Sequence, residues 1–289
     1  MGETLALVTA VCYGVTHFCS GMLARRSNGI AVACYAQVGG SIVIIVVALA
    51  FPGGPATWSA LAWGALSGVG TGLGMAFLYR GMGRGKMSVV APVSDVNAAL
   101  LPVLVGIVLL GERPSAIVLY AMAAAVPAIW LVSRSPGRTR ELVAGAGRAA
   151  ARRGHTGVGD GLAAGVGIAL TWVALERIPA GTGLWPLVVS RVVSVAAIIP
   201  LVLATRTSLR VPSGLAVKAG LAGTVGTVGT WLYMLATREQ LLAIVSVLSA
   251  LYPAIPVLLA LVFLRERITA TQTAGLAIGA AAISIIALN

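Results

Sequence analysis

The stretch VVAPVSDVNAALLPVLVGIVLLGERP, residues 89–114, is apolar along most of its length but carries Asp95 and Asn97 and ends on Glu112 and Arg113. About 20 apolar residues in a helix are enough to cross a hydrocarbon core about 30 Å thick. A charge at the bilayer centre costs at least about 2.5–3.5 kcal/mol, so Asp95 needs a functional or structural partner. The stretch therefore predicts a membrane-spanning helix that lines a cavity and stops at the interface at Glu112.

The composition extends this prediction to the whole chain. Its 289 residues are 58% hydrophobic and only 10% charged, with a mean hydropathy of +0.98, whereas a soluble domain is about 25% charged. Long uncharged runs predict an all-α integral membrane protein with ten transmembrane helices. The expected spans are residues 4–23, 30–51, 58–79, 87–110, 115–133, 158–175, 183–205, 214–236, 241–264 and 269–288.

The basic residues are distributed unevenly between the loops. Loops after odd-numbered spans, counted together with Lys218 at the start of the span 214–236, hold sixteen Lys and Arg residues, and loops after even-numbered spans hold three. By the positive-inside rule, the odd loops, including the basic segment 134–157, are expected in the cytoplasm and both termini outside. The net charge of +12 is then a signal of topology in the inner (cytoplasmic) membrane, with the bilayer as partner and no nucleic acid.

The sequence is also an internal duplication. A shift of 154 positions aligns Pro102 with Pro256 and Glu112-Arg113 with Glu266-Arg267. We therefore expect a first repeat at 1–133, a basic cytoplasmic linker at 134–157 and a second repeat at 158–289. Each repeat has five spans, an odd number, so the second repeat must enter the membrane from the opposite face. Inverted repeats of this kind are typical of secondary transporters.

Two segments carry a more specific resemblance. The stretch LYRGMGRGKMSVVAPVSDVNAALLPVLVGIVLLGERPS and its copy LATREQLLAIVSVLSALYPAIPVLLALVFLRERITATQTAGLAIGAAAISIIAL resemble the two halves of EamA-domain proteins of the drug/metabolite transporter superfamily. The resemblance implies ten helices in two inverted five-helix repeats and the export or exchange of small metabolites or drugs. The second copy departs from the pattern at Arg265, which replaces the glycine before Glu-Arg.

Two ionised groups lie deep in the predicted spans. Asp95 lies about 12 Å from the cytoplasmic face and Arg191 about 12 Å from the outer face, at 1.5 Å per residue. In a core about 30 Å thick, their depths differ by about 6 Å. The two groups would either pair and lock two helices, or face one cavity. In a cavity, Asp95 would bind a cationic group or a coupling proton and Arg191 an anionic group, which would suit a zwitterion such as an amino acid.

Other polar or aromatic side chains in these spans extend the predicted substrate-binding set to Asn97, Gln37, His17, Thr171, Trp172 and Ser249. Gln37 is the repeat equivalent of Arg191, a position where the resembled family often has arginine. His17 would relay protons or simply line the pore with hydrogen-bonding groups. Pro92 and Pro102 are expected to break the helix that carries Asp95, and Pro253 and Pro256 to bend or loosen its repeat equivalent.

Three classes of function remain to be compared. A secondary transporter, most simply an exporter, accounts for the duplication and for the polar groups inside the membrane. A membrane-embedded enzyme would need converging nucleophiles, carboxylates or metal ligands, and the sequence predicts no catalytic or metal site and no cofactor apart from a coupling proton. A non-transporting scaffold or receptor is the remaining alternative. The expected partner is a small-molecule substrate, and monomer and homodimer both stay open.

Overall fold

The structure is a computed structural model that describes residues 1–24, 27–51, 53–84, 87–133, 158–263 and 269–288. The regular elements within these ranges are all α-helices, as predicted. They are α1 (Gly2–Ala24), α2 (Gly29–Ala50), α3 (Trp58–Arg84), α4 (Met87–Val108), α5 (Ala116–Ser133), α7 (Val158–Glu176), α8 (Trp185–Thr205), α9 (Ser213–Glu239), α10 (Leu242–Ala250), α11 (Ala254–Phe263) and α12 (Ala270–Leu288). Nine predicted spans are single helices, and α10 and α11 together form the tenth.

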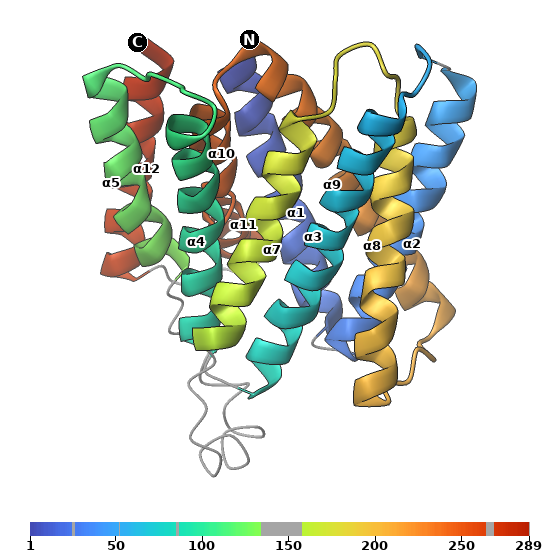
Figure 1. Ribbon diagram of the computed structural model, residues 1–289. Helices are drawn as coiled ribbons and strands as arrows, with labels where there is room; N and C mark the ends of the chain where they lie inside the picture. Colours follow the sequence, from blue (N-terminus) through green and yellow to red (C-terminus); the bar gives the residue numbers. More distant parts are fainter. Residues whose placement is uncertain (25–26, 52, 85–86, 134–157, 264–268, 289) are drawn as a thin grey trace.

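The two halves of the chain run in opposite directions through the bundle. The two termini lie at the same end of the molecule, which we call the termini face (Figure 1). Helix α1 runs away from that face, whereas α7, which begins the second half, runs towards it. Helix α5 ends and α7 begins at the opposite end, called here the linker face, although residues 134–157 themselves lie outside the described residues. The fold is therefore the predicted pair of inverted five-helix repeats.

The repeats interlock rather than stand side by side. Helix α3 packs on α7 and α8 of the second repeat, and the equivalent helix α9 packs on α1 and α2 of the first. Helices α2 and α8, equivalent to each other, are also in contact, as are α5 and α12. Each contact between the repeats thus has a counterpart related by an approximate two-fold axis, and the centre of the molecule is built from both repeats.

Small residues allow these helices to approach closely. A Cβ on Gly223 of α9 would overlap the backbone carbonyl of Ala36 on α2. A Cβ on Gly167 of α7 would lie 2.6 Å from the backbone nitrogen of Gly74 on α3. Backbone contact through small residues is the usual way in which membrane helices associate, because lipid supplies no hydrophobic driving force between them.

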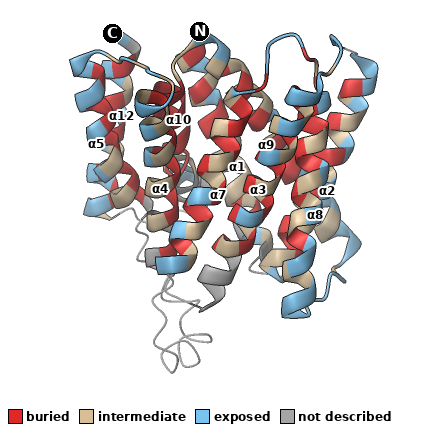
Figure 2. Ribbon diagram, in the orientation of Figure 1, coloured by how far each residue is buried: buried red, intermediate tan, exposed pale blue. Residues whose placement is uncertain are grey.

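Apolar side chains cover the outside of the bundle. On α2, the side chains of Val38, Ile42, Val46 and Leu49 are exposed at helical spacing, while Gln37 and Ser41 point inward. Figure 2 shows the same separation of buried and exposed faces on most helices. By length and composition, four described helices, α2, the Trp58–Leu78 part of α3, α7 and α8, can cross a membrane, and shorter apolar helices accompany them. The protein is therefore an integral multi-pass membrane protein.

Of the two spans in which prolines were expected to disturb the helix, only one is interrupted in the described residues. Helix α4 is continuous from Met87 to Val108 through both of its prolines, so the expected break at Pro92 and Pro102 was wrong. The break lies instead in the equivalent span, between α10 and α11. There the N–H of Tyr252 bonds to the carbonyl of Ser249, three residues back, at 3.2 Å. Pro253 and Pro256 remove donors one turn apart, whereas the two prolines of α4 are almost three turns apart.

Candidate functional site

A cavity of about 110 Å³ lies in the centre of the bundle. Helices α1, α2, α3, α7, α8 and α9 and the turn at Tyr252 contribute to it, so both repeats form its wall. Five of the eight predicted substrate-binding residues line this cavity. They are His17, Gln37, Thr171, Trp172 and Arg191.

Arg191 is held at the cavity wall by uncharged groups. Its guanidinium donates a hydrogen bond of 2.9 Å to Oε1 of Gln37 and one of 3.4 Å to the carbonyl of Gly226, and it also donates to the hydroxyl of Thr230. Ser194 donates to the same Oε1 of Gln37 at 3.2 Å. Because Arg191 and Gln37 are repeat equivalents, 154 positions apart, their hydrogen bond joins the two halves near the approximate two-fold axis.

Of the two alternatives for Asp95 and Arg191, direct pairing is not found in the described structure. Among the described residues, no carboxylate forms an ion pair with Arg191. Asp95 is buried on α4 and accepts a hydrogen bond of 2.5 Å from the hydroxyl of Tyr252, which lines the cavity. The Asp95 carboxylate therefore lies behind Tyr252 and is not itself part of the cavity wall.

Aromatic rings form one part of the cavity wall. The rings of Tyr13 and Trp172 are nearly parallel, with centroids 6.4 Å apart and 8° between their planes. Tyr252 meets Tyr13 edge to face at 6.4 Å and stacks on the ring of His17 at 4.9 Å. Tyr233, fully buried behind Trp172, stacks on it at 5.3 Å. The rings of both repeats thus support one another around the cavity.

Two predicted residues lie away from the cavity. Asn97 on α4 donates a hydrogen bond of 3.1 Å to the carbonyl of Leu162 on α7. The Ser249 hydroxyl is buried and lies 3.5 Å from the carbonyl of Ala6. Both side chains join neighbouring helices in this conformation, and their role in substrate binding stays a prediction.

Sequence reasoning missed several lining residues, of which Tyr13, Thr16, Ser20, Thr71, Thr230 and Tyr252 carry polar groups. A usable signal was present in α1, where four lining positions, Tyr13, Thr16, His17 and Ser20, recur at helical spacing and share one face. Tyr252 carried no comparable signal, because its position depends on the break between α10 and α11.

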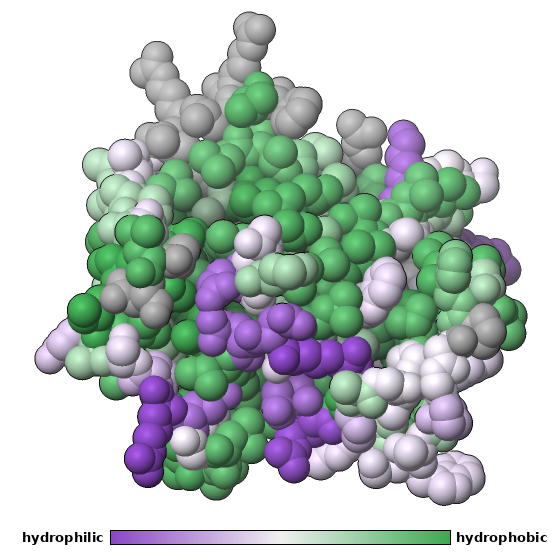
Figure 3. Space-filling view, turned by 90° about the horizontal axis from the view of Figure 1, so that it is seen from above, coloured by the Kyte–Doolittle hydropathy of each residue, from purple (hydrophilic) through white to green (hydrophobic). Residues whose placement is uncertain are grey.

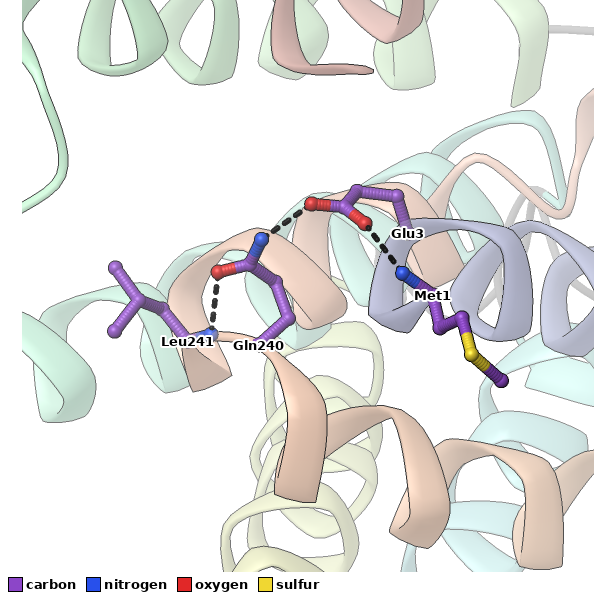
Figure 4. Close-up of polar contacts among 4 residues, drawn as sticks. All are labelled: Met1, Glu3, Gln240 and Leu241. Carbon is purple, nitrogen blue, oxygen red and sulfur yellow. Dashed lines mark hydrogen bonds and ion pairs between the residues drawn. The ribbon is translucent and has the colours of Figure 1, made fainter.

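Contacts between the repeats join the two halves at the termini face. The carboxylate of Glu112 accepts hydrogen bonds from the backbone N–H groups of Leu242 and Ala243, at 2.6 and 3.0 Å. Figure 4 shows a second contact, in which Glu3 lies between the Met1 amine, at 3.6 Å, and the side-chain amide of Gln240. Viewed from this face, hydrophilic side chains gather near the centre (Figure 3).

The described residues contain no cluster of three His, Cys, Asp or Glu side chains that could hold a metal ion. The three cysteines, Cys12, Cys19 and Cys34, are free. What the geometry does contain is an inverted repeat around a central polar cavity within a multi-pass membrane bundle, which is the architecture of secondary transporters.

Comparison with known proteins identifies the family. The model of the EamA-like transporter family matches residues 1–134 and 156–288, which is nearly the entire chain. The protein belongs to the EamA-like transporter family, within the drug/metabolite transporter superfamily.

No curated protein sequence matches the chain significantly. Among solved structures, one described as "Crystal structure of protein" superposes with a TM-score of 0.68. It is 19% identical in sequence, and the match covers 99% of this chain and 97% of that one. This likeness supports the fold over the full length of the chain.

Proposed function

We propose that the protein is a secondary transporter that moves a small metabolite or drug across the cytoplasmic membrane by alternating access. The observation that carries this proposal is the position of Arg191, buried in a cavity between two inverted repeats and bonded to its repeat equivalent Gln37. A substrate held there contacts both halves at once. A rocking movement of one repeat against the other would then carry the substrate from one face to the other.

Export is the direction that the geometry favours. The cavity extends from the aromatic rings towards the linker face, where Ser20 near the end of α1 and Ala33 near the start of α2 line it. At the termini face, the Glu112 and Glu3 contacts hold the two repeats together. The basic loops orient the linker face to the cytoplasm. The described conformation is then one that loads substrate from the cytoplasm.

Proton coupling is a separate part of the proposal. Asp95 is the acidic residue best placed for it, because its hydrogen bond from Tyr252 connects it to the cavity wall. A proton on Asp95 would remove the charged acceptor from Tyr252. Protonation of Asp95 would in this way influence Tyr252, which faces the substrate.

The transport proposal is tested in two steps with purified protein. Thermal unfolding in detergent is measured with amino acids, nucleosides, organic cations and organic anions, because a ligand that binds only the folded state raises the melting temperature. The class that stabilises is then loaded into proteoliposomes for counterflow. We expect exchange by the wild type and by Arg210→Gln, which removes an exposed loop charge, and loss of exchange in Arg191→Gln.

The proposal would be contradicted if, for every stabilising compound, flux were the same in empty liposomes, in liposomes with wild-type protein and in liposomes with Arg191→Gln. Binding without flux would indicate that the protein is a receptor. Conversion of the compound to a product would indicate that it is an enzyme.

A further inference from the structure

The charge of the cavity wall identifies what the cavity binds. Among the described residues that line it, Arg191 is the one permanently charged side chain and none is acidic. Arg191 is only 9% exposed, so its charge is largely removed from solvent. Burial of a charge without a counter-charge is unfavourable, and a bound anion would relieve this cost. The net charge of the wall therefore favours a ligand with a single negative charge.

The hydrogen bonds of Arg191 point to a carboxylate. A guanidinium has five N–H donors, and Gln37, Thr230 and Gly226 accept three hydrogen bonds from Arg191. These neutral acceptors fix the plane of the guanidinium without neutralising its charge. A fixed, planar guanidinium matches the two oxygens of a carboxylate in a paired hydrogen-bond arrangement.

The rest of the wall accepts a flat, apolar group. Tyr13 and Trp172 present nearly parallel rings, and Tyr252 with the stacked His17 forms the adjacent side. The wall also includes Gly226, which adds no side chain. Aromatic surfaces bind planar rings by offset stacking or edge-to-face contact.

We propose that the substrate is a small aromatic monocarboxylate, with its carboxylate on Arg191 and its ring against Tyr13 and Trp172. This assignment rests on the proposed transport function and narrows it. A zwitterion would bring an ammonium group into a wall without a described carboxylate, since Asp95 lies behind Tyr252. The protein therefore selects monoanions over zwitterions of the same ring size.

The test compares matched probes on wild-type protein by isothermal titration and thermal unfolding. Benzoate, its neutral analogue benzamide, cyclohexanecarboxylate, phenylalanine and benzylammonium are the probes. We expect benzoate to bind at least tenfold more tightly than benzamide, benzylammonium and phenylalanine. We also expect it to bind more tightly than cyclohexanecarboxylate, which has the charge but no aromatic ring.

Three variants locate the binding. Arg191→Gln is expected to abolish the preference for benzoate over benzamide, and Arg191→Lys to keep part of it. Trp172→Leu is expected to reduce the preference for benzoate over cyclohexanecarboxylate and to leave the charge preference intact. Because the probe pairs are compared on wild-type protein first, failure of a variant to fold leaves the main comparison in place.

Counterflow of each probe in proteoliposomes separates the two proposals. Benzoate binding with benzoate counterflow supports both. Benzoate binding without counterflow of any probe supports the carboxylate site and overturns transport. If phenylalanine or benzylammonium binds more tightly than benzoate and also shows counterflow, the proposed substrate class is wrong and the transport function is supported. Absence of benzoate binding at millimolar concentration overturns the substrate class.

Discussion

At the scale of single residues, the cavity wall contains two pairs of repeat equivalents. His17 and Thr171 are repeat equivalents, and both line the cavity, as do Gln37 and Arg191. Position along a helix follows from the sequence, so the depth of these residues was predictable. The side of the helix that faces the cavity depends on its neighbours, which is why Asn97 could be placed in depth but points to α7.

Glu112 has a different role from the interfacial stop that its position at the end of a span suggested. Its carboxylate accepts two backbone hydrogen bonds at the start of α10, in the other repeat. The first N–H groups of a helix have no partner within the helix, and the helix dipole favours a negative charge there. The Gly-Glu-Arg motif of the first repeat therefore ties the two repeats together at the termini face.

We predict that Glu112→Ala lowers the free energy of unfolding by about 1–2 kcal/mol, because it removes a charged helix cap. The measurement is the thermal unfolding of purified protein in detergent. Arg113→Ala, which changes the exposed neighbour, is the matched control. Equal melting temperatures for the two variants would show that the Glu112 contact contributes no stability.

At the scale of elements, contact between α2 and α9 depends on residues without side chains. Gly223 faces the carbonyl of Ala36, and Gly39 faces the backbone of Gly220. Glycines can be recognised in a sequence, but the helix against which each one packs, here α2 against α9, is known only from the structure. The break between α10 and α11 was less predictable, because prolines occur in both copies of that span and only their spacing differs.

We predict that Gly223→Ala destabilises the protein by about 1–3 kcal/mol, because the new methyl group forces α9 away from α2. Gly214→Ala, in the first turn of the same helix, is the control, since a Cβ there meets no atom within 4 Å. Its stability is expected to be unchanged or slightly higher, as alanine is the better helix former. The measurement is the melting temperature of each variant. Equal destabilisation of the two would contradict the close contact between α2 and α9 at Gly223.

At the scale of the whole molecule, the internal duplication determines the architecture. The odd number of spans per repeat predicted the inversion, and the structure confirms that both termini lie at one face. Helices from both repeats line the cavity, and contacts between the repeats join them at the termini face. If contacts related by the approximate two-fold axis form and break alternately at the two faces, the same cavity opens to each side in turn. Alternating access is thus the central claim.

The measurement that tests this claim most directly is the two-sided accessibility of Thr71, a cavity-lining residue on α3. Thr71→Cys is placed in a background without Cys12, Cys19 and Cys34, and a membrane-impermeant maleimide is applied to right-side-out and to inside-out vesicles. Val166→Cys, on the outer surface of α7, is the control and should react from neither side.

We predict that the cysteine at position 71 reacts from both faces, faster from the linker face, to which the cavity extends in the described conformation. Reaction from the linker face alone, even after prolonged exposure at the termini face, would contradict alternating access.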